Sequence, residues 1–276
     1  MRVRVGCRFI YQSEIPIPMI MAIQPPQQYA HRLLEQYRTF RPQVPVHTYR
    51  DSFGNTIWRL VTPVGDLCIE YDAVAEVPPT PDPVLLDLPR TPIEQLPDEV
   101  LLYTLPSRYC QSDLFINDVW EMFGDRPGGW PQVQAVCDWL HAHITYGAGS
   151  MSSTSAWDSY QQRRGVCRDF AHLGVAFCRA LNYPARYVCG YLPDIGVPVA
   201  PTPMDFHAWF EVYMDDAWRT FDARHNRPRT GRVLIATGRD AVDVAFSTLY
   251  GNAQLLKLQV WADEVPDDFQ LDGETA

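Results

Sequence analysis

Three residues of this chain combine side-chain types and spacing that suit nucleophilic chemistry. Cys167 begins a segment, 167–181, whose apolar residues recur at helical spacing, and Gly165 precedes it where a tight turn is useful. Free N–H groups and the helix dipole in a first helical turn favour an anion. We therefore predict that Cys167 readily forms a thiolate, which is the form of cysteine that attacks a carbonyl carbon.

His207 and Asp222 are the predicted base and its partner. Residues 207–214 and 218–224 alternate in polarity as two antiparallel strands would, with a turn between them. A register with Trp209 opposite Asp222 makes His207 and Asp222 diagonal neighbours on one face, about 7–8 Å apart at the backbone. Asp222 would then orient the ring that takes the thiol proton and later protonates the leaving group. A slip of one residue would separate the two onto opposite faces.

At these residues the chain resembles the bacterial transglutaminase-like superfamily, whose members are often described as cysteine proteases. The resemblance is strong over residues 100–262 and weaker over the β-rich start. The stretches that carry it are 165–173, 184–191, 207–212, 218–222 and 238–244.

The resemblance implies an α+β fold with a papain-like or transglutaminase-like catalytic core. In such a core the cysteine lies at a helix N-terminus packed on an antiparallel sheet, and a small β-rich domain precedes it here. By this resemblance, the family's catalytic roles fall on Cys167 as the nucleophile, His207 as the base and Asp222 as the acid that orients the base. The chain departs from the family at Arg224-His225-Asn226, where many relatives have Pro-Thr-Asn, so the pocket rim is expected to differ.

The organisation expected along the chain has two parts. Residues 1–77 contain alternating stretches typical of a small antiparallel β domain, and 78–98 are a proline-rich linker. Residues 99–276 form the predicted catalytic domain, in which the proline-rich loop 193–206 would make a rim or lid beside His207. The elements expected in it are helices over 113–123, 130–144, 155–162 and 167–181, and strands over 185–192, 207–214, 218–224, 233–237 and 254–262.

Bulk composition narrows the classes of function. The 276 residues carry a net charge of −10 with no clustered basic stretch, which argues against a nucleic-acid partner. Seven scattered cysteines without a CxxC suit a reducing compartment. No signal-peptide pattern and no apolar run of about 20 residues is present, so we expect a cytoplasmic protein without a membrane partner.

Other residues of reactive type receive structural interpretations. Cys178 and Cys189 fit a buried core, His172 a structural hydrogen bond, and Asp169 a favourable charge at the helix N-terminus. The basic residues of 227–232 are expected to be solvated surface. No zinc or calcium pattern is present, so neither a metal nor another cofactor is predicted.

Two questions stay open. Glu211 shares the strand face of His207 and fits either a pocket or a salt bridge. The backbone N–H of Cys167 is the safer donor to an oxyanion, with side-chain alternatives only weakly indicated. Those alternatives are Gln161, Tyr146 and Trp157.

The function that these residues favour is amide chemistry through a thioester on Cys167, with a peptide or protein substrate. Water as the second nucleophile makes a protease or amidase, which we favour, whereas an amine makes a transglutaminase. Trp209 on the His207 face could shield a thioester from water and supports the second alternative. A binding or scaffold protein without catalysis is a third alternative. The substrate and the oligomeric state are not predicted.

Overall fold

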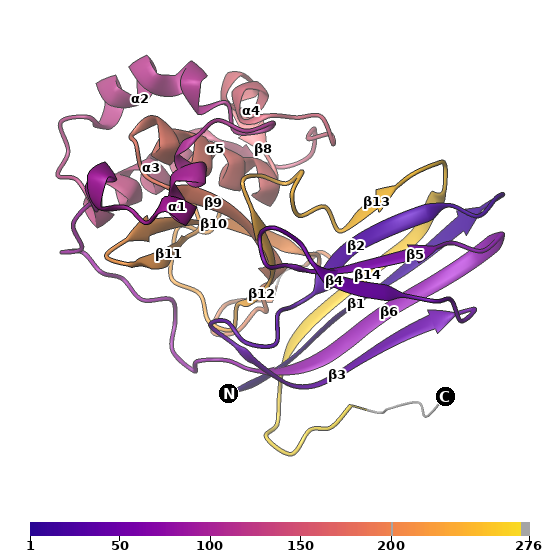
Figure 1. Ribbon diagram of the computed structural model, residues 1–276. Coiled ribbons are helices and arrows are strands. Elements are labelled where there is room, and N and C mark those ends of the chain that lie inside the picture. The colour runs from indigo at the N-terminus through magenta and orange to yellow at the C-terminus, as the bar shows by residue number, and fades with distance from the viewer. Residues whose placement is uncertain (200, 272–276) are drawn as a thin grey trace.

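A computed structural model describes residues 1–199 and 201–271 of the chain. Two four-stranded antiparallel sheets lie together in one half of the molecule, and a third four-stranded sheet covered by helices forms the other half (Figure 1). This is the predicted α+β fold, with antiparallel sheets throughout the larger units.

The two sheets of the first half pack face to face as a sandwich. One has the strand order β14-β1-β6-β3 and the other β13-β2-β5-β4. Trp58 joins them, since its ring lies 5.6 Å from that of Phe40 and 6.0 Å from that of Tyr71 in the opposite sheet. The strands are β1 Arg2–Ser13, β2 Pro18–Gln24, β3 Arg32–Arg41, β4 His47–Arg50, β5 Thr56–Val61, β6 Gly65–Glu76, β13 Ser247–Leu249 and β14 Gln254–Val265.

The end of the described chain returns to this sandwich. β14 pairs with β1 from Gln12↔Gln254 to Arg2↔Val265, and β13 pairs with β2. The strands at Ser247–Leu249 and Gln254–Val265, which the prediction placed in the 99–276 catalytic domain, thus pair with strands of the N-terminal sheets. Residues 272–276 of that predicted domain lie outside the described residues. The division of the chain into two domains stays a prediction.

The second half places helices against the sheet β11-β10-β9-β12. The central helix α5 contacts both β9 and β10. Gly174 of α5 lies so close to Phe210 of β10 that a Cβ there would overlap its ring, so this glycine sets the distance between helix and sheet. The elements are α2 Ile116–Phe123, α3 Trp130–His143, α4 Ala156–Gln162, α5 Cys167–Ala180, β9 Ala185–Tyr191, β10 His207–Met214, β11 Ala217–Phe221 and β12 Val233–Gly238, with short pieces α1 Asp98–Leu101, β7 Thr145–Tyr146 and β8 Arg164–Gly165 and 3₁₀ turns at Ile93–Gln95, Leu102–Thr104 and Ser112–Phe115.

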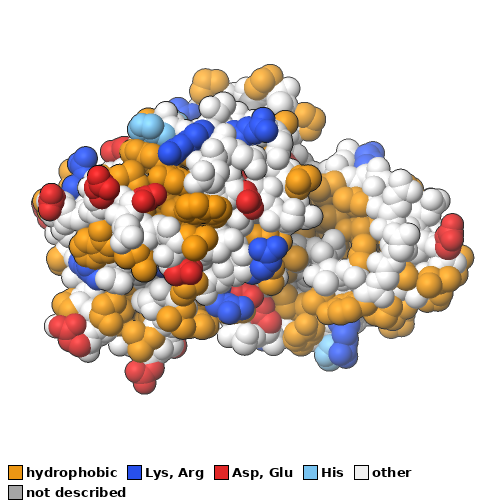
Figure 2. Space-filling view, turned by 90° about the horizontal axis from the view of Figure 1, so that it is seen from above, with side chains coloured by type: hydrophobic (Ala, Val, Ile, Leu, Met, Phe, Trp, Pro, Cys, Tyr) orange, Lys and Arg blue, Asp and Glu red, His pale blue; other side chains and the backbone are white. Residues whose placement is uncertain are grey.

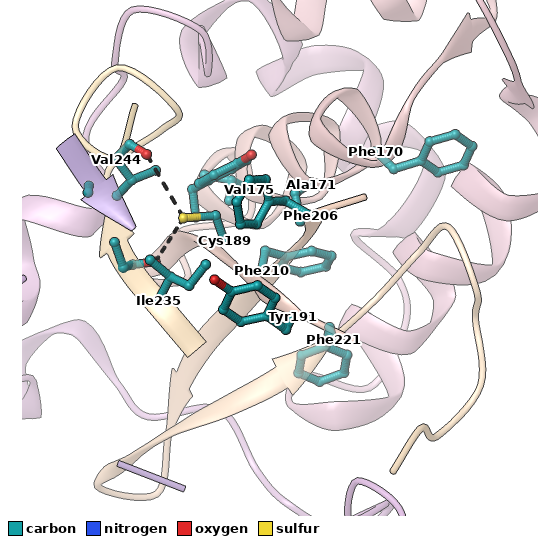
Figure 3. Packing of buried hydrophobic residues seen from close by; sticks show 14 of the residues in the cluster. Phe170, Ala171, Val175, Cys189, Tyr191, Phe206, Phe210, Phe221, Ile235 and Val244 are labelled. Atoms are coloured by element: carbon teal, nitrogen blue, oxygen red, sulfur yellow. Dashed lines mark hydrogen bonds between the residues drawn. The ribbon is translucent and has the colours of Figure 1, made fainter. Parts of the chain in front are cut away.

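The core between α5 and the sheet is apolar (Figure 3). Cys189 lies within it, its thiol facing the carbonyls of Ala236 and Val244 at 3.7 and 3.9 Å. All eight residues of β10 are buried, although their alternating polarity fits a strand with one polar face. The polar β10 residues are buried because they contact charged side chains from other segments, as His207 contacts Asp222 and Glu211 contacts Arg186.

The proline-rich stretch 78–98 is largely irregular, as its composition predicts, apart from a 3₁₀ turn and the first residue of α1. It is nevertheless fixed to the second half, because the Asp82 carboxylate binds both Arg229 and Arg232.

Basic and acidic side chains are interspersed over the face drawn in Figure 2, without a continuous basic surface there. Within the described chain, no helix has the length and apolar character needed to cross a membrane.

Candidate active site

The N-terminus of α5 holds Cys167 at the surface of a cavity of about 330 Å³, which we call the Cys167 cavity. The helix begins there because the Asp169 carboxylate accepts a hydrogen bond from the Val166 N–H at 2.8 Å. Gly165 is needed for space, since a Cβ on it would lie 2.6 Å from the Asp169 Cβ. The predicted helix start and the structural role of Asp169 are thus both confirmed.

His207 and Asp222 come together at the open end of the β10–β11 hairpin. The ladder runs from Met214↔Ala217 to Phe210↔Phe221, which is the predicted register, and the next residue of each strand leads toward the site. The His207 Nε2 lies 2.8 Å from the Asp222 Oδ2, and both side chains are more than nine-tenths buried.

Cys167 and His207 line the same cavity, and the Cys167 Sγ lies 4.0 Å from the carbonyl oxygen of Phe206. Burial alone would lower the pKa of His207, but the charge of Asp222 and hydrogen bonds to Asp222 and Cys167 outweigh it and raise the pKa. Because Asp222 occupies Nε2, the ring nitrogen left to exchange a proton with Cys167 is Nδ1.

Asp222 is held as a carboxylate by several donors. Besides His207, the Arg232 Nη2 donates to its Oδ2 at 3.0 Å and the His225 N–H to its Oδ1 at 3.2 Å. Burial would raise the pKa of Asp222, yet the charges of His207 and Arg232 overcome it and hold the pKa well below its usual range. A carboxylate that is ionised at neutral pH can keep His207 in one orientation.

Arg232 was expected on the surface and is instead almost fully buried. Its Nε donates to Asp82 at 2.8 Å while its Nη2 donates to Asp222, and its guanidinium lies 5.0 Å from the centre of the Trp209 ring. Arg229 is also buried, bound to Asp194. The surface interpretation of 227–232 was therefore wrong for these two arginines. Asp82 is 150 residues from Arg232 and Asp194 is 35 residues from Arg229, so no local pattern marks these two pairs.

His225 belongs to the tripeptide that departs from the family pattern. Its ring centre lies 5.0 Å from that of His207, and the guanidinium groups of Arg224 and Arg229 lie against its ring nitrogens. Burial and the neighbouring positive charges lower the pKa of His225 to about 3, although Asp222 opposes this. His225 is thus a neutral side chain next to His207.

One group of potential metal ligands includes the catalytic candidates. Ligand atoms of His207, Asp222 and His225 lie within 4.8 Å of one another. Arg232 already occupies the Asp222 carboxylate, and two further guanidinium groups face the His225 ring. Such positive surroundings oppose a bound cation, so these residues fit a metal poorly.

The other cysteine and histidine candidates have the predicted structural roles. Cys178 and Cys189 are buried, which raises the pKa of both thiols, that of Cys189 to about 12. His172 is fully buried and its Nε2 accepts the Ala241 N–H at 3.2 Å.

Glu211 forms a salt bridge and also lines the cavity of Trp209, which is separate from the Cys167 cavity. Its carboxylate binds Arg186 at 2.6 Å and accepts the hydroxyl of Tyr29 from the sandwich half at 3.0 Å. Glu211 therefore anchors the two halves to each other on the face of the sheet away from α5.

The weakly indicated oxyanion donors do not line the Cys167 cavity. Trp157 packs on Phe115 at 5.4 Å, and Tyr146 is stacked under Arg224 at 4.1 Å. Gln161 is exposed on α4. The loop 193–206 does contribute Asp205 and Phe206 to the cavity, as a rim would; residue 200 within it lies outside the described residues.

Known proteins are similar to this chain in both sequence and fold. The sequence model of the "Transglutaminase-like superfamily" matches residues 123–223. A crystal structure of a "putative cysteine protease" from Cytophaga hutchinsonii is similar over 98% of this chain and 92% of that one, with 32% identity and a TM-score of 0.87. An uncharacterized protein of Mycobacterium leprae is 26% identical over 89% of this chain and 90% of its own length. An uncharacterized protein of Mycobacterium tuberculosis is 26% identical over 79% of this chain and 77% of its own length.

Arg232→Met should destabilise the protein by about 3–5 kcal/mol, because it leaves the buried carboxylate of Asp222 and the partly buried carboxylate of Asp82 without their shared cation. Urea unfolding measures the loss. The matched control is Arg219→Met, whose partner Asp215 is two-thirds exposed and which should cost no more than about 1 kcal/mol. Equal losses in the two variants would contradict a special role for Arg232.

Proposed function

The chain belongs to the transglutaminase-like superfamily, and from that membership we propose that it hydrolyses amide bonds in peptides or proteins through a thioester on Cys167. The observation that carries the proposal is the 2.8 Å contact between His207 and Asp222 beside the cavity that Cys167 lines. A thiol, an imidazole and a buried carboxylate, in this order along the chain, are the parts that a cysteine hydrolase needs.

In the proposed reaction the Cys167 sulfur attacks the amide carbonyl carbon after its proton has moved to the His207 Nδ1. His207 then gives that proton to the leaving nitrogen as the C–N bond breaks, and a thioester remains. His207 next takes a proton from water, whose oxygen attacks the thioester carbonyl carbon. The C–S bond then breaks, the carboxylic acid is released, and His207 returns the proton to the Cys167 sulfur. Asp222 keeps its charge throughout and stabilises the protonated ring.

The negative oxygen of each tetrahedral intermediate needs donors near Cys167. The N–H of Cys167 is in the first turn of α5, where no helical carbonyl is available to it. It is the donor that we assign, together with the field of the helix.

Two features favour water over an amine as the second nucleophile. Trp209, which could have shielded the thioester, lines a separate cavity beneath the 78–83 segment and stacks on Arg232. The rim of the Cys167 cavity includes the exposed residues Met151, Ser152 and Asp205. An open rim admits water, whereas efficient transfer to an amine requires its exclusion.

The same open cavity supports catalysis over a silent binding protein, because Cys167 is only half-buried there. All seven cysteines are unpaired, which supports the proposed reducing, cytoplasmic setting.

Competition between water and an amine tests the proposal. A glutamine-containing peptide library is incubated with the protein and a labelled primary amine, and the products are read by mass spectrometry. We expect shortened or deamidated peptides that carry little label, and no products with Cys167→Ala. Cys68→Ala is the matched control and should keep full turnover.

The outcome against hydrolysis is a majority of turnovers that place the amine in peptide. Lys257 is the only lysine in the chain, so few amines of the protein itself can compete with the labelled amine for the thioester.

The pH profile of turnover tests the role of Asp222. Its charge raises the pKa of His207, so the imidazolium persists above its ordinary value of about 6.5 and activity should fall only at higher pH. In Asp222→Asn the negative charge beside His207 is lost, and burial then lowers the pKa of the ring. The fall of activity at alkaline pH should therefore begin at a lower pH than in the unsubstituted protein. We also expect kcat to fall by on the order of 10⁴, as in the serine-protease precedent.

Asp215→Asn, a neutralisation at the exposed turn of the same hairpin, should leave the profile in place. A drop in kcat of less than about tenfold for Asp222→Asn, with an unmoved alkaline limb, would make Asp222 merely structural.

A further inference from the structure

β14 is an edge strand whose outer side has no partner strand among residues 1–199 and 201–271. It is twelve residues long and exposes Leu255, Leu256 and Leu258 to between 39 and 46%. Such an edge offers a row of unpaired N–H and C=O groups to another strand, and natural proteins usually shorten, charge or cover it. Lys257 is the sole basic residue on this strand and the sole lysine of the chain.

We propose that β14 pairs antiparallel with β14 of a second copy of this chain, around a two-fold axis at Val260. The joined strands would extend the sheet β14-β1-β6-β3 across both copies. A second copy fits because the strand is complementary to itself in one register.

The geometry of antiparallel pairing limits the registers. Over Lys257–Val265 the ladder with β1 is continuous, so alternate residues direct their N–H and C=O groups to β1 and the others direct them outward. Residues that stand opposite each other across a β14–β14 pair must both be of the outward kind or both of the inward kind. They are therefore separated by an even number of positions in the sequence.

Charge then selects one register among these. Asp263 is separated from Lys257 by an even number of positions and Glu264 by an odd number, so only Asp263 can stand directly opposite Lys257. The two-fold axis forms this pair twice, once on each side of Val260. Opposite charges across neighbouring strands stabilise the pairing, whereas Lys257 opposite Lys257 would oppose it.

The other face of the strand suits the same register. Val260 and Ala262 lie on the sandwich-core face and are buried, whereas Leu258 on that face is 39% exposed. Around Val260, each Leu258 stands beside Ala262 of the other copy, and the two valines meet at the axis. The pairing would thus join the apolar interiors of two sandwiches.

A water-soluble carbodiimide, which joins a carboxylate to an amine as an amide with loss of water, tests this pairing directly. Lys257 and Asp263 of one copy are about 20 Å apart along an extended strand, so a bond of zero length between them must join two copies. We expect a covalent dimer containing the Lys257–Asp263 cross-link by mass spectrometry, and a dimer mass in analytical ultracentrifugation.

Charge variants give the matched comparison. Lys257→Glu should raise the dimer dissociation constant by on the order of tenfold, because it sets acid against acid twice. Adding Asp263→Lys should restore the dimer, whereas adding Glu264→Lys, with the same net charge on the other face, should not. Unchanged circular dichroism and Cys167 alkylation show that the variants fold.

Lys257 could instead serve only to prevent association at the edge. That role predicts a monomer at every soluble concentration and no Lys257–Asp263 cross-link, and this result overturns the proposal. A dimer that is indifferent to Lys257→Glu, or equally restored by both second substitutions, also overturns it.

Discussion

The buried guanidinium of Arg232 is the interaction on which the candidate site depends. It lies between two carboxylates, with Asp222 at 3.0 Å on one side and Asp82 at 2.8 Å on the other. Burial favours the neutral form of Asp222, and the charges of His207 and Arg232 together hold its pKa well below the usual range. Loss of Arg232 would therefore weaken the support that Asp222 gives to a protonated His207, the proposed base for the Cys167 thiol.

This interaction also explains why the proline-rich segment is ordered against the second half. The Asp82 carboxylate accepts hydrogen bonds from the Arg232 Nε and from the Arg229 backbone N–H. The proline-rich segment thereby helps to position the guanidinium that binds Asp222. The sandwich half is attached independently, through the Tyr29 hydroxyl on Glu211. A segment that composition describes as a spacer thus helps to keep Asp222, the proposed orienting acid, in its charged form.

The features that could be predicted from the sequence are those set by residues close together in the chain. The start of α5, the β10–β11 register and the meeting of His207 with Asp222 follow from periodicity and a short turn. Arg232 could not be predicted in this way, because its partner Asp82 is 150 residues distant and nothing near either residue marks the pair. The return of β14 to β1 was missed for the same reason: a strand pattern shows that a strand exists, but not which edge it joins.

Competitive alkylation of the seven cysteines shows whether Cys167 is the activated thiol and whether His207 activates it. The folded protein is treated with a limiting amount of iodoacetamide at mildly acidic to neutral pH, and the modified positions are quantified by mass spectrometry. The account predicts that Cys167 is labelled first and that His207→Ala slows it, while Cys178 and Cys189 react only after unfolding because burial raises the pKa of their thiols. Equal labelling of Cys167 and another cysteine in the folded protein, or a rate at Cys167 that His207→Ala leaves unchanged, would contradict it.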